Sequence, residues 1–121
     1  MRPALVAVST LLSSAAMAAG PGAPGLYVYG HEVETFQPCH SKQVFWVTGA
    51  EASLNPLRQW AERKRRATGK PYQAIYVELN GRVDRDSKRD GFAANYDGVF
   101  HLTKVETVLP DVPRSCPGHE N

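Results

Sequence analysis

Two adjacent residues of this 121-residue chain carry side chains suited to covalent chemistry. Cys39 stands next to His40 in the segment GHEVETFQPCHSKQVFWV, and a thiolate with an imidazole base can act as a nucleophile. Such catalysis needs a free thiolate and a base aligned with it. Neighbouring side chains of an extended segment point to opposite sides. We therefore expect no nucleophilic catalysis at this pair.

The histidines offer a second kind of chemistry, because imidazole is a common ligand of copper and zinc. They are His31, His40, His101 and His119. No two of them have the spacing that places side chains on one face of a strand or helix, so a metal site would have to be assembled across strands. The hypothesis that remains is a metal ion between His40 and His119. Its alternative is two exposed histidines, since dedicated sites usually have three or four ligands.

The N-terminus indicates the compartment. In residues 1–19, Arg2 precedes an apolar run at 4–12. The segment ends in AMAA, which fits the small-x-small pattern of a signal-peptidase site. The apolar run is shorter than the roughly 20 residues that a membrane-spanning helix needs. We predict a signal peptide at 1–19, export to the periplasm and no membrane span.

Export changes the meaning of the two cysteines. An exported chain whose only cysteines are Cys39 and Cys116 is expected to join them in a disulfide. The bond would close a loop of about 78 residues and stabilise the fold by roughly 4.5 kcal/mol. It would also tie the Pro-rich tail, 110–121, back to the domain.

Charge and size exclude some classes of protein. Without the signal peptide roughly 100 residues remain, enough for one small domain. Thirteen Lys and Arg then face twelve Asp and Glu, because Arg2 leaves with the signal peptide. A net charge this close to zero is not typical of a nucleic-acid-binding protein.

Aromatic and β-branched segments predict a mainly β domain over 26–109, after a flexible leader at 20–25. Residues 26–38 predict one bent strand or two short strands, with the bend at Gly30. The segment QVFWVTG predicts a strand covered on both faces, and VFHLTKVETVL predicts the last strand.

The segment YQAIYVELNGRV predicts another strand, in which Ile75, Val77 and Leu79 face the core. Tyr76 then falls on the wet face, where its ring could stack on a ligand. Asn80 and Gly81 form a dipeptide typical of a hairpin turn.

One helix is predicted between these strands. Asn55 suits its N-cap, Pro56 its first position and Gly69 its C-terminal cap. The basic run 63–66 is explained by the negative end of the helix dipole, with a polyanion site as the alternative.

Four or five strands with one helix make either an open sheet carrying a packed helix or a closed barrel plugged by it. The bend at Gly30 favours the barrel. We therefore predict a small OB-like five-stranded barrel with one α-helix, the open α+β sheet being the alternative.

The segments YVYGHEVETFQPC, VFWV, YQAIYVELNGRV and DGF…YDGVFHLTKV, taken in this order, resemble the OB-like C-terminal domain of the NlpE envelope lipoproteins and small exported proteins similar to it. The resemblance covers roughly 25–108. It implies an OB-like barrel in the bacterial envelope, a link to surface sensing, envelope stress or copper tolerance, and no enzymatic activity. The chain departs from that family in having neither a lipid-attachment cysteine nor a CxxC motif.

These observations lead to three expected functions. The first is a non-catalytic binding or sensing module of the periplasm, without a cofactor, whose partner is an envelope protein or a small ligand. The second is a metal-binding tolerance protein using His40 and His119. The third is an inhibitor of an envelope enzyme.

Overall fold

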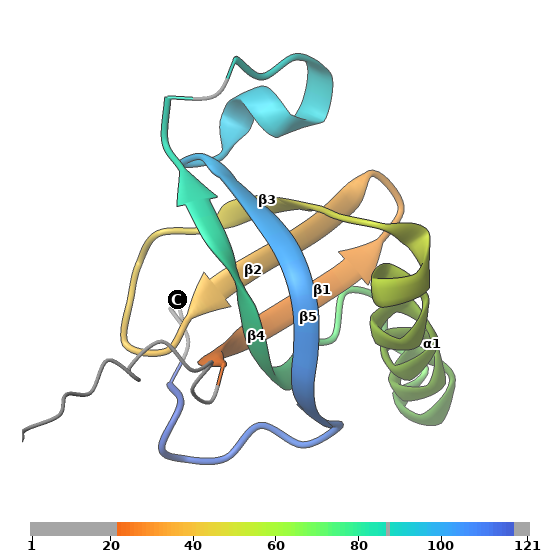
Figure 1. Ribbon diagram of the computed structural model, residues 1–121. Helices are drawn as coiled ribbons and strands as arrows, with labels where there is room; N and C mark the ends of the chain where they lie inside the picture. Colours follow the sequence, from red (N-terminus) through yellow and green to blue (C-terminus); the bar gives the residue numbers. More distant parts are fainter. Residues whose placement is uncertain (1–21, 87, 118–121) are drawn as a thin grey trace, which may run out of the picture.

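The computed structural model describes residues 22–86 and 88–117. Its elements are β1 (Ala23–Gly30), β2 (Val33–Pro38), β3 (Phe45–Thr48), α1 (Glu51–Thr68), β4 (Ile75–Asp84), the 3-10 helix η2 (Gly91–Asn95) and β5 (Val99–Leu109). The strands close into a barrel in the order β1-β2-β3-β5-β4 (Figure 1). Only β3 and β5 pair in parallel; the other neighbours are antiparallel. This is the predicted OB-like five-stranded barrel, and the open-sheet alternative is wrong.

The segment after the leader forms two strands rather than one bent strand. A hairpin joins β1 to β2, with Gly30 opposite Val33 and Glu32 in the left-handed conformation at φ 60°. Counting these strands separately places α1 after the third strand, the position that the OB order requires. The leader ends earlier than expected, because β1 already begins at Ala23. The predicted signal peptide, 1–19, lies outside the described residues.

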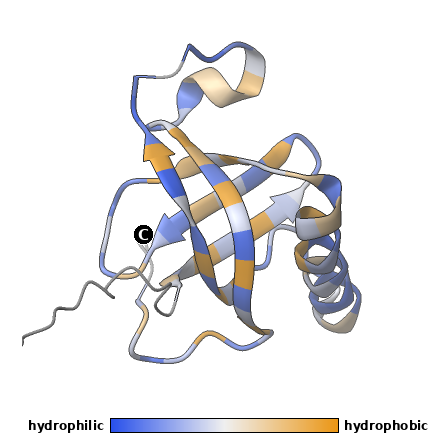
Figure 2. Ribbon diagram, in the orientation of Figure 1, coloured by the Kyte–Doolittle hydropathy of each residue, from blue (hydrophilic) through white to orange (hydrophobic). Residues whose placement is uncertain are grey.

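Side chains of alternate strand residues fill the barrel, and Figure 2 shows the resulting alternation of hydrophobic and hydrophilic positions along β4 and β5. The core cluster contains Tyr27, Phe36, Phe45, Val47, Leu54, Leu57, Ala61, Ile75, Val77, Leu79, Phe100 and Leu102. Three of these belong to α1, so the helix plugs the barrel with its apolar stripe. No helix in the described part of the chain has the length and hydropathy needed to cross a membrane.

Helix α1 begins four residues before the predicted N-cap. Ala50 is the N-cap, and Asn55 and Pro56 lie inside the helix. The earlier start buries Leu54, which adds one turn to the apolar stripe that packs on the barrel. Pro56 is the sixth residue of the helix and lies beyond the first turn, so the helix lacks the hydrogen bond that a backbone N–H there would donate to the carbonyl of Ala52. The other end agrees with the prediction, since Gly69 caps it at φ 72°.

The predicted turn at Asn80 and Gly81 is wrong, because β4 runs through both residues to Asp84. A register shift against β5 occurs at this dipeptide. A Cβ at position 81 would lie 2.3 Å from the carbonyl oxygen of His101 and 2.8 Å from the ring of Phe100. Glycine is therefore explained by close approach of the neighbouring strand rather than by a turn.

Candidate ligand-binding groove

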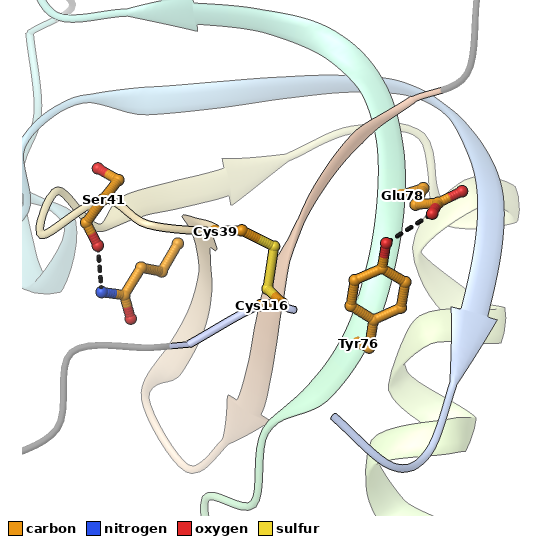
Figure 3. Close-up of a disulfide and its surroundings, with 6 residues drawn as sticks. Cys39, Ser41, Tyr76, Glu78 and Cys116 are labelled. Atoms are coloured by element: carbon orange, nitrogen blue, oxygen red, sulfur yellow. Dashed lines mark hydrogen bonds between the residues drawn. A yellow bond between two sulfur atoms is a disulfide. The ribbon is translucent and has the colours of Figure 1, made fainter. Parts of the chain in front are cut away.

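The predicted disulfide between Cys39 and Cys116 is present, with an S–S distance of 2.00 Å. Both cysteines of the chain are therefore bonded, and no thiolate is left for nucleophilic chemistry. Cys116 is buried against Leu26 and Tyr76 on the outer side of the barrel wall (Figure 3). The bond therefore fixes the C-terminal tail over an apolar patch of β1 and β4. A disulfide persists in oxidising compartments, which indicates a location outside the reducing cytosol.

Tyr76 does not lie on an exposed face, so the expectation of a wet side chain there is wrong. It is 9% exposed, and the tail covers it through Cys116. Its hydroxyl donates to the Glu78 carboxylate, and this hydrogen bond raises the pKa of Tyr76 (Figure 3). Strand alternation correctly placed the residue outside the barrel, but it could not reveal that the tail returns over it.

His40 is exposed beside the disulfide, in the left-handed conformation at φ 65°. Its backbone N–H donates to the carbonyl of Pro117 at 3.4 Å. His119, its predicted partner at a metal ion, lies outside the described residues. Residues 22–86 and 88–117 contain no group of three or more His, Cys, Asp or Glu side chains arranged to hold a metal. The metal hypothesis stays a prediction.

A charged network joins α1 to the barrel. Arg58 of α1 donates from Nε and Nη2 to both carboxylate oxygens of Glu34 in β2, at 2.8 and 2.7 Å. Tyr27, fully buried in β1, donates its hydroxyl to the same carboxylate at 2.7 Å. At the rim, Arg58 also donates to Glu51 at 3.0 Å.

Burial and the neighbouring charge of Glu34 raise the pKa of Tyr27 far above its ordinary value, so the phenol stays neutral. The hydrogen bond from Arg58 to Glu34 raises the pKa of Arg58, which keeps its charge. A bidentate pair of this kind has a fixed geometry. The network therefore fixes one side of the helix, and Lys64 fixes its other end by donating to the carbonyls of Ala74 and Pro110 at 2.8 and 2.7 Å.

Two adjoining hollows lie between the outer side of α1 and the end of β1. The first measures about 520 Å³ and has Tyr29 on one side and a stripe of α1 on the other, with Arg58 among its lining residues. The rest of the stripe is Asn55, Gln59, Glu62, Arg63 and Arg66. The second measures about 400 Å³ and lies between Glu62, Arg65, the β1–β2 turn and Tyr72. Both are lined by Tyr29 and Glu62, so we treat them as one feature, the helix groove.

Tyr72 gives the groove an aromatic surface. The residue is 47% exposed and its ring lies against Gly30, where an added Cβ would approach the ring to 2.6 Å. Its hydroxyl donates to the carbonyl of His31 at 3.2 Å. The backbone of Tyr72 is left-handed at φ 56°, which is strained for a bulky residue. Strain of this kind is concentrated at functional sites.

The basic run 63–66 is largely engaged within the chain. Arg63 stacks on Trp60, with its guanidinium carbon 4.7 Å from the ring centroid. Arg65 and Arg66 both approach Glu62, at 2.9 and 3.9 Å. Arg63 has no carboxylate partner among the residues that the structure describes. The basic run therefore has a partly structural role. Its three guanidinium groups still outnumber the one carboxylate beside them, that of Glu62.

The helix groove was not predicted from the sequence. Asn55, Gln59, Arg63 and Arg66 follow helical spacing, and such a polar stripe is ordinarily read as the solvent face of a helix. Tyr29 is far from the stripe in sequence and reaches it only through the fold, whereas Tyr72 follows the end of α1 closely. The one local signal was the row of polar side chains itself. Comparison of the chain with protein-family models, curated proteins and solved structures found no match.

Proposed function

We propose that this chain is a non-catalytic binding or sensing module of the bacterial envelope, exported to the periplasm by a signal peptide at 1–19. The helix groove carries the proposal, because it combines an exposed aromatic ring with hydrogen-bonding and charged groups. The disulfide supports an oxidising compartment. OB-like barrels serve as binding modules in many contexts, which supports the class of function by analogy of fold.

The resemblance to the C-terminal domain of NlpE adds a cellular setting to the proposal. A role in envelope stress or copper response would follow from it. Export is tested by sequencing the N-terminus of the protein recovered from the periplasm. A mature chain starting near Gly20 supports the proposal, and an intact Met1 contradicts it.

Binding at the helix groove is tested by NMR. The isotopically labelled, disulfide-bonded chain is titrated with size-fractionated extracts of the bacterial cell envelope. We expect the amide signals of Tyr29, Gln59 and Tyr72 to shift with at least one fraction. A matched chain with Tyr72→Asn should lose the response, because asparagine tolerates the left-handed backbone but has no ring. Shifts confined to other surfaces, or none with any fraction, would contradict binding at this groove.

The metal-binding alternative is supported by one described residue, His40, and by the position of the tail at the disulfide. Calorimetry with Cu(II) and Zn(II) on the wild type and on His40→Ala with His119→Ala tests it. Loss of a measurable affinity in the double variant would support a site, and unchanged affinity would end the hypothesis.

A further inference from the structure

The helix groove contains polar groups that the fold does not use. Asn55 and Gln59 are exposed on α1, and neither amide has a hydrogen-bonding partner among the described residues. Each amide presents two donors and one acceptor oxygen. They line the same hollow as Arg63 and Arg66, one to three helical turns away on one face. A ligand with many hydroxyl groups would satisfy this set.

The charges of the groove define the ligand further. Arg58 is neutralised by Glu34 and Glu51, so it adds no net positive charge. Arg63, Arg65 and Arg66 remain, against Glu62 alone. This excess favours a ligand with a few negative groups, because guanidinium pairs with carboxylate through two parallel hydrogen bonds.

Glu62 argues against a polyanion that has no hydroxyl groups. It lines both hollows, so a continuous ligand must pass close to it. An acidic sugar carries hydroxyl groups that can donate to the Glu62 carboxylate, whereas the links of a deoxynucleotide chain offer it only like charge. The chain as a whole carries a formal net charge of only +2, which also disfavours nucleic acid.

Tyr72 supplies the remaining feature. Its ring is held between Gly30 and solvent, with its hydroxyl bonded to His31, so it offers a fixed apolar face in the second hollow. A flat ring whose hydroxyl is already hydrogen-bonded within the chain loses less entropy when a ligand stacks on it than a free side chain would. The apolar face of a pyranose ring is suited to such a platform, and Arg65, bonded to Glu62, lines the same hollow.

We propose that the helix groove binds an acidic oligosaccharide, in which one sugar stacks on Tyr72, the next pairs its carboxylate with Arg63 and Arg66, and Gln59 and Asn55 bond hydroxyls of the sugars that follow along α1. The two hollows, of about 400 and 520 Å³, hold at least two consecutive sugar units. This inference rests on the proposed binding function and specifies its ligand class.

The test uses defined probes with the disulfide-bonded chain. Tetragalacturonate carries one carboxylate per sugar, maltotetraose carries none, and an eight-residue oligothymidylate carries a phosphate at each link. We expect tetragalacturonate to shift the amide signals of Tyr29, Gln59 and Tyr72 in NMR titrations. Its affinity should exceed that of maltotetraose about tenfold, as removal of a charged hydrogen-bonding partner predicts.

Variants separate the two parts of the site. Arg63→Gln with Arg66→Gln should lower the affinity for tetragalacturonate to that for maltotetraose and leave the latter unchanged. Tyr72→Asn should weaken both saccharides by a similar factor. The matched control is Lys42→Gln with Arg82→Gln, which removes the same charge outside the groove and should change neither.

Three results would overturn the inference: equal binding of the acidic and neutral saccharides, tighter binding of oligothymidylate than of tetragalacturonate, or no shifts at the groove with tetragalacturonate. If envelope fractions shift the groove signals while tetragalacturonate does not, the ligand class is wrong and the binding function stands. If neither does, the binding function fails as well.

Discussion

The wall formed by β1 and β4 is stabilised in different ways on its two sides. On the inner side, Tyr27 bonds to Glu34, and Arg58 ties that carboxylate to α1. On the outer side, Tyr76 bonds to Glu78 and is covered by the tail that the disulfide holds. Leu26 pairs with Tyr76 on the outer side, and the next residue, Tyr27, pairs with Ile75 on the inner side. Adjacent residues of β1 therefore take part in the two different networks.

The inner and outer sides of this wall need different interactions to hold the segment that covers them. A helix can plug the inner side because its apolar stripe supplies burial, and one ion pair then fixes its orientation. The described part of the tail, 110–117, lacks regular structure and buries only Cys116. Its packing would therefore not offset the conformational entropy lost by ordering it without a cross-link. We therefore expect the outer side to depend on a covalent bond and the inner side on charge and packing.

The largest effect should come from removing the covalent closure. Cys39→Ser with Cys116→Ser should lower the free energy of unfolding by about 4 kcal/mol, because the open chain gains entropy and the patch around Leu26 and Tyr76 is uncovered. Urea unfolding measures it. Reduction of the wild type should give the same loss, and a loss below about 1 kcal/mol would contradict the dependence on the bond.

A smaller effect is expected on the inner side. Arg58→Met leaves the Glu34 carboxylate buried with Tyr27 as its remaining partner, and should cost about 2 kcal/mol, less than for a fully buried pair because the Arg58 side chain is 24% exposed. Glu51→Gln is the control, since this partner lies at the rim and should change stability by less than about 0.5 kcal/mol. Equal effects of the two variants would show that the ion pair of Arg58 with Glu34 contributes no more to stability than a surface contact does.

The phenol of Tyr27, on the inner side of the wall, also predicts that the free energy of unfolding falls at alkaline pH. The pKa of Tyr27 is raised by burial, so above pH 10 the unfolded chain loses a proton that the folded chain keeps. Stability from this group is complete below about pH 10 and falls by about 1.4 kcal/mol per pH unit above it. Tyr27→Phe should remove this slope in urea unfolding between pH 9 and 11. The matched variant Tyr76→Phe should change the slope less. A larger change with Tyr76→Phe than with Tyr27→Phe would contradict the difference between the inner and outer sides of the wall.

The smallest effect concerns the edge of the helix groove. Gly30→Ala places a Cβ 2.6 Å from the Tyr72 ring, so the ring must move. Because that ring is partly exposed, we expect a loss of stability of about 1 kcal/mol or less. The Tyr72 amide should shift strongly in NMR spectra while that of Tyr76 stays in place. Unchanged Tyr72 signals would show that the ring is not held against the hairpin.

Much of the fold was predictable from local patterns. The buried series Ile75, Val77 and Leu79 follows strand alternation, and Gly69 ends the helix as expected. The turn predicted at Gly81 is wrong, because glycine is required there by the close approach of β5 and not by a reversal of the chain. The helix start failed because Leu54 is buried by packing that the Asn-Pro dipeptide does not report.

The sequence alone determined the even number of cysteines, the periods of the strands and the apolar stripe of the helix. A count needs no coordinates, and each period depends on residues near one another along the chain. The sequence therefore yielded the disulfide and the OB-like barrel. Only the tertiary structure decided that Tyr76 is covered and that Tyr29, Tyr72 and the arginines of α1 line one groove. Tyr76 is far in sequence from the tail, and Tyr29 is far from α1, so closure of the barrel brings them together. Tyr72 follows α1 closely, and its place depends on how the chain turns after the helix.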